Sequence, residues 1–203
     1  MVRNFQARGR YCRQATLRGM GLLPKLRGAL QVGDLTISRM NKGLLAALIL
    51  VGIMVVVLAA MGREWICKCG TAKLWHGVVV SSENSQHLSD WYTPSHVIHG
   101  FLFFGLGWLI MRRANWGWRL ALATLIEIPW EIVENTDAII NRYREVTISL
   151  DYNGDSIVNS TADVAAMFIG FALAARLPIW VTVVLAVGLV YPMDWVVQWQ
   201  TKN

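Results

Sequence analysis

Charged residues are scarce in this sequence: they make up 16% of its 203 residues, whereas soluble domains average about 25%. This shortage argues against a soluble enzyme, a disordered chain or a coiled coil. Cysteine and proline are also rare, with three and five residues, which excludes a disulfide-rich scaffold and a collagen-like or proline-rich chain. Apolar residues, in contrast, reach 55%, and there are ten tryptophans. This composition is typical of a membrane protein, because tryptophan is enriched at membrane–water interfaces.

Long apolar segments define the predicted architecture. Residues 43–62 contain no charge and, at about 1.5 Å per residue, cover roughly the 30 Å of a bilayer core. We expect a retained span rather than a cleaved signal peptide, because its apolar core is too long. Further spans are predicted at residues 94–111, 117–134 and 156–176, and residues 179–193 form either a marginal span or a re-entrant or interfacial segment. The predicted fold class is all-α, a polytopic transmembrane helical bundle of about five spans.

Basic residues determine the predicted orientation. Residues 1–42 carry nine Lys and Arg against one acid. With the N-terminus in the cytoplasm, thirteen of the nineteen basic residues lie inside, as the positive-inside rule prefers. We therefore expect a multi-pass protein of the cell inner membrane, with the lipid bilayer as its main partner. The basic segment 1–42 is expected to be poorly ordered and to bind no nucleic acid, and residues 43–203 form the transmembrane helical domain.

Ionisable residues lie inside the predicted spans, where a charge costs about 2.5–3.5 kcal/mol at mid-bilayer. His96 and His99 share one face of the second span because they are three residues apart. Stripes of acidic and polar residues follow one face of each of the next two spans: Glu127, Glu131 and Glu134, and then Asp155, Asn159 and Asp163. Since consecutive spans run in opposite directions, all three sets lie at similar depth near the outer side. The sequence therefore predicts one polar pocket that opens to the periplasm.

Two histidines and several carboxylates on facing helices suit a metal site. The predicted ligands of a divalent metal ion are His96, His99, Glu131, Glu134 and Asp155. The predicted catalytic acids and bases are His99, Glu131, Glu127 and Asp163. Such a centre would polarise an ester or a phosphate and activate water. Two other interpretations stay open: a polar network that only holds the helices together, and a proton or ion path.

The two outer connections supply further candidates. Arg142, Tyr143 and Arg144, together with Asn159, are predicted to bind substrate. The arginines suit an anionic lipid headgroup because arginine makes bidentate contacts to oxyanions, although they would also pair with nearby acids. In the other connection Cys67-x-Cys69 would form a disulfide, supply thiolates to a metal, or stay reduced.

Three sequence runs resemble a known family. The runs SSENSQHLSDWYTPSHVIHGFLFF, IEIPWEIVENTDAIINRYRE and TISLDYNGDSIVNSTADVAAMFIGFALAARLPIW are similar to those of a family of uncharacterised multi-pass inner-membrane proteins from alphaproteobacteria. This resemblance implies an integral membrane protein without an established activity, and it supplies no catalytic residues. A looser likeness is to VanZ-like membrane proteins, whose Asp/His pair, Glu and Asp-Asn-Gly series would correspond to these residues: Asp90 and His96, Glu131, and Asp155, Asn159 and Gly170.

The sequence is compatible with two functions. The pocket would act as a metal-assisted hydrolase or transferase on a lipid or envelope substrate. The alternative is a non-enzymatic conduit for protons, ions or a solute, or an assembly factor whose polar network fixes helix packing. The sequence identifies neither a substrate nor the metal.

Overall fold

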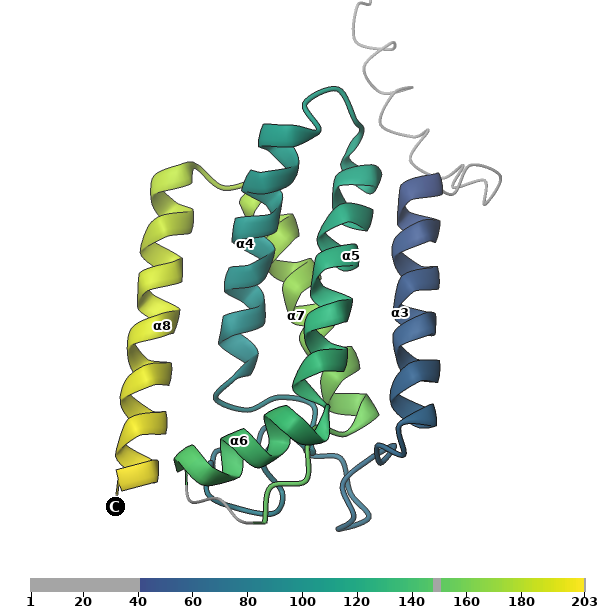
Figure 1. Ribbon diagram of the computed structural model, residues 1–203. Coiled ribbons are helices and arrows are strands. Elements are labelled where there is room, and N and C mark those ends of the chain that lie inside the picture. Colours follow the sequence, from purple (N-terminus) through teal and green to yellow (C-terminus); the bar gives the residue numbers. More distant parts are fainter. Residues whose placement is uncertain (1–40, 148–150, 203) are drawn as a thin grey trace, which may run out of the picture. The chain divides into compact units, whose positions relative to one another are not determined.

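The computed structural model describes residues 41–147 and 151–202, so the predicted basic segment lies outside the described residues except for its last two. Five long helices run alongside one another (Figure 1). Their bounds are α3 Lys42–Ala60, α4 Thr93–Ile110, α5 Trp116–Glu134, α7 Ile157–Ala174 and α8 Ile179–Lys202. The described residues contain no strand. The predicted all-α helical bundle is confirmed.

Three of these helices, α3, α7 and α8, are long and apolar enough to cross a membrane. Helices α4 and α5 have nearly the same length, 18 and 19 residues, but they carry most of the histidines and carboxylates that the sequence placed inside the spans. The last apolar segment, expected to be short, continues through Pro192 to Lys202 and is 24 residues long. It extends because apolar residues continue beyond Asp194, as Trp195, Val196 and Val197.

Helix α4 packs most closely against α7, and α3 packs against α5. At the α4–α7 contact a Cβ atom on Gly100 or Gly170 would overlap the backbone of the opposite helix. Small residues allow helix backbones to approach closely in this way. The neighbouring apolar core comes from three helices: Ala47, Met54 and Leu58, Leu120 and Ala123, and Val164, Met167 and Phe171.

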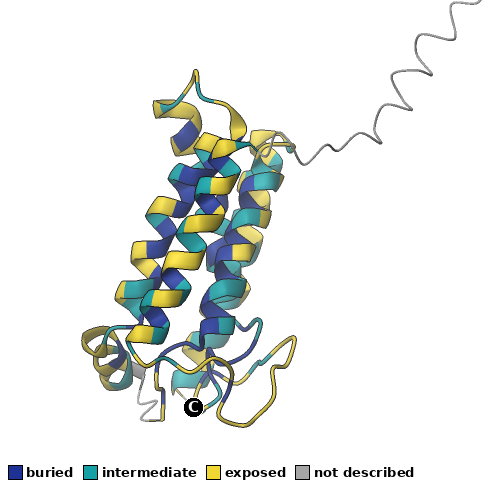
Figure 2. Cartoon of the chain, turned by 90° about the vertical axis from the view of Figure 1, so that its right-hand side faces the viewer, coloured by how far each residue is buried: buried dark blue, intermediate teal, exposed yellow. Residues whose placement is uncertain are grey.

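Buried residues extend beyond the helices at one end of the bundle. In Figure 2 dark blue residues run along the inside of the helices and continue into the loops at the lower end. The connection between α3 and α4 folds across this end, and so does α6, Asp137–Thr147 (Figure 1). The segment 135–155, expected as a plain connection, therefore contains a helix. Its Ile140 is buried, so α6 covers the polar end of the bundle with an apolar contact.

Candidate functional site

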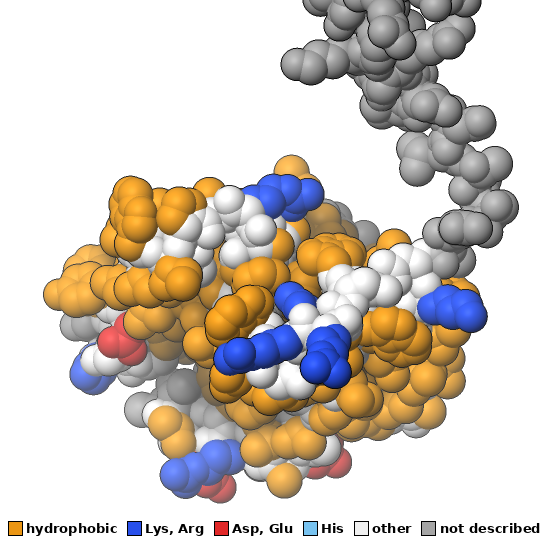
Figure 3. All heavy atoms as spheres, turned by 90° about the horizontal axis from the view of Figure 1, so that it is seen from above, with side chains coloured by type: hydrophobic (Ala, Val, Ile, Leu, Met, Phe, Trp, Pro, Cys, Tyr) orange, Lys and Arg blue, Asp and Glu red, His pale blue; other side chains and the backbone are white. Residues whose placement is uncertain are grey.

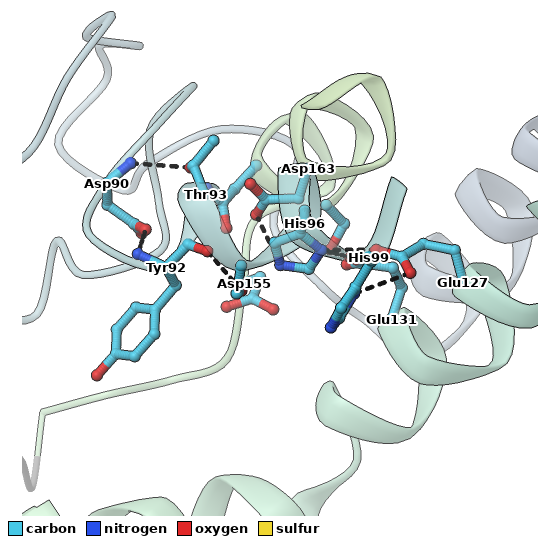
Figure 4. Close-up of polar contacts among 12 residues, drawn as sticks. Asp90, Tyr92, Thr93, His96, His99, Glu127, Glu131, Asp155 and Asp163 are labelled. Carbon is cyan, nitrogen blue, oxygen red and sulfur yellow. Dashed lines mark hydrogen bonds and ion pairs between the residues drawn. The ribbon is translucent and has the colours of Figure 1, made fainter. Parts of the chain in front are cut away.

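His96 lies in the first turn of α4 and contacts carboxylates from two other helices. Its Nδ1 is 2.7 Å from Glu127 Oε1 and 3.3 Å from Glu131 Oε1. Its Nε2 is 3.9 Å from Asp163 Oδ2. Figure 4 shows the imidazole between the two carboxylates of α5 and the carboxylate of α7. The structure thus brings together the histidine pair of α4 and the acidic stripes of α5 and α7, which the sequence placed at one depth.

His99 lies almost one turn further along α4 and shares Glu127 with His96. The Nδ1 atom of His99 is 3.0 Å from Glu127 Oε2, while the carboxylate itself is completely buried. The His99 side chain remains 27% exposed and contacts the rings of Phe103 and Trp130. Since Trp130 is itself exposed, His99 is the member of the pair that can be reached from the apolar outer surface of the bundle.

Two groups of potential metal ligands overlap at His96. One group combines it with His99 and Glu127, and the other combines it with Glu131 and Glu134. In each group, one ligand atom per residue lies within 4.8 Å of the others. The spacing on α5 explains this geometry, because residues at i, i+4 and i+7 face the same direction.

Carboxylates outnumber histidines in this region. Glu127, Glu131 and Asp163 surround His96, yet among the described residues Glu131 Oε1 and Asp163 Oδ1 have no hydrogen-bond partner. His96 is the shared ion-pair partner of these acids, but burying a carboxylate oxygen without a hydrogen bond is costly. The cluster therefore requires bound protons or a bound cation to offset its negative charge.

Two further buried carboxylates lie in the loops next to the cluster. Burial raises the pKa of Asp90, and it raises the pKa of Asp155 to about 6. The oxygens of Asp155 are already occupied, because Oδ1 accepts a hydrogen bond from the Tyr152 hydroxyl at 2.9 Å and Oδ2 accepts one from Asn135 Nδ2 at 3.0 Å. The role of Asp155 as a metal ligand stays a prediction.

Asn135 is a site residue that the sequence prediction missed. Its side chain is completely buried and links the end of α5 to the start of α7. The Oδ1 atom accepts a hydrogen bond from the Asp155 backbone N–H at 2.8 Å, and Nδ2 lies 3.3 Å from Ser160 Oγ. The available signal was its position directly after α5, where an asparagine ends a helix.

The predicted substrate-binding residues are only partly brought to the cluster. Tyr143 donates or accepts a hydrogen bond with the Tyr92 hydroxyl at 2.7 Å, and it lines a cavity of about 40 Å³ together with His96 and Asp163. Asn159 lines the same cavity, but its amide group donates to the His87 carbonyl at 2.8 Å.

The two arginines lie apart from this cavity. Arg142 is exposed and its nearest acid is Glu145, at 4.0 Å. Arg144 donates to the Tyr152 carbonyl and to Asn153 Oδ1, so its guanidinium group holds the loop before α7. Their contact with an anionic headgroup stays a prediction.

Over residues 41–147 and 151–202, fold and site together define a helical bundle. Three of its helices are able to cross a membrane by length and composition, and a histidine–carboxylate cluster is buried near one end. The chain belongs to the family described as "protein of unknown function (DUF2585)", which matches residues 58–202. The resemblance to an uncharacterised family is thereby confirmed.

Several curated relatives carry the name UPF0314 protein. The one from Paracoccus denitrificans is 58% identical over 150 residues, covering 71% of this chain and 78% of the relative. UPF0314 protein R03235 from Rhizobium meliloti is 56% identical over 176 residues, covering 77% and 89%. UPF0314 protein Atu8092 from Agrobacterium fabrum is 44% identical over 192 residues, covering 83% and 96%. No solved structure matches this chain.

Proposed function

We propose that this chain is a multi-pass inner-membrane protein that binds a divalent metal ion at His96 and acts as a hydrolase or transferase on a lipid or envelope substrate. The observation that carries the proposal is the buried excess of carboxylate around His96. Glu131 Oε1 and Asp163 Oδ1 are buried without hydrogen-bond partners. A divalent cation would neutralise both carboxylates and would also use the lone pairs of the imidazole groups.

The donor set supports a transition metal or zinc rather than calcium. Imidazole nitrogens suit zinc, manganese and iron when combined with carboxylate oxygens, whereas calcium prefers oxygen ligands alone. Each of the two ligand groups contains His96 and at least one glutamate. A bound metal would supply Lewis-acid chemistry and an activated water. Glu131 and Asp163 would then act as proton acceptors near that water.

The surroundings of His99 support a lipid as the substrate. The cavity beside His96 has a volume of only about 40 Å³, which is enough for an ion or a water but not for a headgroup. A large substrate must therefore reach the cluster from outside. His99 is partly exposed beside the aromatic rings of Phe103 and Trp130. This apolar approach suits the hydrocarbon part of a lipid better than a soluble metabolite.

The charge distribution supports the proposed orientation. Figure 3 views the bundle from the end where α4 joins α5, and Lys and Arg side chains interrupt its apolar surface there. The basic residues of the turns and first helical turns at this end are Lys42, Arg112, Arg113, Arg119 and Arg176. Described residues 108–119 and 173–181, which form the two turns, contain no acid. A basic end of this kind favours the cytoplasmic side, so the histidine–carboxylate cluster would lie toward the periplasm.

The opposite half of the bundle argues against a conduit. A proton or ion path needs polar groups or water across the whole bundle. Beyond Glu127, toward the α4–α5 turn, the described core is well buried and apolar, with Leu120, Met167 and Phe171. Its buried Thr124 hydroxyl donates to the Leu120 carbonyl of the same helix at 2.8 Å. The buried polar groups therefore stop near the middle of the helices.

Elemental analysis of the full-length protein, purified in detergent without chelator, tests the metal. We expect near-stoichiometric metal in the wild type and its loss in Glu131→Gln and His99→Ala variants that stay monodisperse. Glu145→Gln is the matched control, because Glu145 is an exposed glutamate on α6. Wild-type protein without metal would contradict the proposal.

Activity is tested separately with inner-membrane lipid extracts. Mass spectrometry should detect a released headgroup or acyl chain with the wild type and with Glu145→Gln, but not with folded Glu131→Gln. If Glu131→Gln instead yields no folded protein, the cluster is a structural network, since breaking a buried charged pair costs about 3–5 kcal/mol in soluble proteins.

A further inference from the structure

The loop between α3 and α4 contains a second site with its own chemistry. Cys67 and Cys69 form a disulfide in the wall of a cavity of about 510 Å³. The charged and amide side chains that line this cavity come from three segments: Arg63, Glu64 and Lys68, Glu83 and Gln86, and Asn153 and Asp155. The cavity is therefore polar and offers both signs of charge.

This disulfide contributes little to holding the fold. A disulfide stabilises a protein mainly by restricting its unfolded chain, and the effect grows with the length of the loop that it closes. Cys67 and Cys69 are only two residues apart. The disulfide therefore connects no segments that are far apart in the chain, and structural cross-linking does not explain it.

The two sulfur atoms lie in different environments. Cys67 is 3% exposed, and its Sγ accepts a hydrogen bond from the Cys69 backbone N–H at 3.1 Å. Cys69 is exposed. An incoming thiolate therefore reaches Cys69, and the departing Cys67 thiolate keeps a hydrogen-bond donor that lowers its basicity. Access to one sulfur and a stabilised leaving group at the other are the two conditions for fast thiol–disulfide exchange.

A metal bound by the reduced cysteines fits less well. The sulfurs do lie near Glu83 and His87, with all ligand atoms within 4.8 Å. However, the Lys73 backbone N–H donates to His87 Nδ1 at 3.2 Å, so the neutral ring carries its proton on Nε2, which lies 2.9 Å from Glu83 Oε2. A ring that binds a metal through Nε2 needs a proton on Nδ1, where the backbone already donates.

We propose that the Cys67–Cys69 disulfide oxidises small charged thiols that bind in this cavity. A substrate thiolate attacks Cys69 Sγ; the bond between the two cysteines breaks, and its electron pair leaves with Cys67 as a thiolate. A second substrate thiolate attacks the substrate sulfur of the mixed disulfide and releases Cys69. Two thiols become one disulfide, and their two protons and two electrons reduce the protein disulfide to a dithiol.

The charges of the cavity determine the substrate class. Arg63 and Lys68 suit the carboxylates of a peptide-like thiol. Glu64 suits its ammonium group, because the exposed ion pair of Glu64 with Lys68 can exchange partners. Glu83, in contrast, already pairs with Lys73 and His87. A thiol that carries both kinds of charge fits this wall, whereas an acyl chain does not. Glutathione is the probe of choice because it carries both.

The test uses the full-length protein in a Cys12→Ser background, which leaves only the two cysteines of the pair. Intact-mass spectrometry after acid quenching should show that glutathione reduces the disulfide and that oxidised glutathione restores it. With oxidised glutathione, Cys67→Ser should form a mixed disulfide at Cys69 at least ~10-fold faster than Cys69→Ser forms one at buried Cys67.

Three outcomes would overturn the proposal. The folded protein resists reduction by glutathione, the two single-cysteine variants react at equal rates, or the reduced protein holds zinc that Cys67→Ser loses and His99→Ala keeps. None of them bears on metal at His96, because that metal would be lost in His99→Ala and kept in Cys67→Ser. The reduction of the Cys67–Cys69 disulfide is measured with both cysteines of the pair present, so it stands even if a single-cysteine variant fails to fold.

Discussion

The two halves of the bundle are built from the same helices but held by different forces. Toward the α4–α5 turn, α4, α5 and α7 meet through apolar side chains such as Phe171. The backbone contact of Gly100 with Gly170 lies where the two halves join, because Gly100 directly follows His99 in α4. Toward the other end the same helices meet through His96, Glu127 and the neighbouring polar groups. The apolar half fixes the geometry by packing, whereas the polar half accepts buried groups without partners.

This difference indicates a division of labour. Membrane proteins gain little hydrophobic stabilisation between helices, because lipid tails are as apolar as leucine, so close packing has to hold the helices together. A rigid, closely packed half can hold costly carboxylates such as Glu131 and Asp163 in place at the other half. Substitutions deep in the apolar half should therefore change only the stability of the protein. Substitutions in the polar half should also change the histidine–carboxylate cluster.

The largest expected effect comes from the close α4–α7 contact where the two halves join, with Gly170→Ala. The added Cβ would overlap the backbone at Val97 on α4, so the two helices must separate. We expect a loss of about 3 kcal/mol in unfolding free energy, measured by denaturant titration in detergent. Gly105→Ala on α4 is the matched control, because a Cβ there meets no atom within 4 Å. Equal effects of the two substitutions would show that the close contact does not hold the bundle.

A smaller loss is expected in the polar half, with Asn135→Ala. The substitution leaves the Asp155 backbone N–H and one Asp155 carboxylate oxygen without their partner. Each unsatisfied buried group costs about 1–3 kcal/mol, and water entering the polar end would recover part of that, so we expect about 2 kcal/mol. Asn141→Ala, at an exposed asparagine of α6, should change stability by less than ~0.5 kcal/mol. If both variants behave like the wild type, Asn135 does not connect α5 to α7.

The helices were predictable from the sequence because their signal is local. Each apolar segment is long enough to define its own helix, and the acidic stripe of Glu127 and Glu131 follows from helical spacing alone. The contact of His96 with both glutamates was also predictable, since alternating spans return to the same side. Local pattern and tertiary packing agree here.

The loops at the polar end were not predictable in the same way. The buried positions of Asp90 and Asn135 depend on segments far apart in the chain, and no periodic pattern marks them. Helix α6 was missed because a stretch with several charged residues resembles a connection, and its helical face is visible only once Ile140 is buried against the bundle. This half is stabilised by hydrogen bonds between segments far apart in the chain, which hydrophobic periodicity does not reveal.

The polar half should also respond to pH. Burial raises the pKa of Asp155 to about 6, from an ordinary value of 3.8, so the folded protein binds a proton more tightly than the unfolded chain does. Unfolding free energy should therefore fall as pH rises from about 4 to about 6, by up to about 1.4 kcal/mol per pH unit for this group. Urea titrations across this range should show a shallower slope for Asp155→Asn. A slope that is unchanged in the variant would assign the pH dependence to other groups.

The smallest expected effect concerns an ion pair on the surface of the polar end. Asp137 Oδ1 lies 3.4 Å from Arg63 Nη2, and the Asp137 side chain is 88% exposed. Water and salt screen such a pair, so Asp137→Ala should cost less than about 1 kcal/mol, including its place in the first turn of α6. The difference from the wild type should disappear in high salt. A large, salt-independent loss would mean that the outer loops hold this half together. The histidine–carboxylate cluster would then owe its geometry to those loops rather than to the packing of α4 against α7.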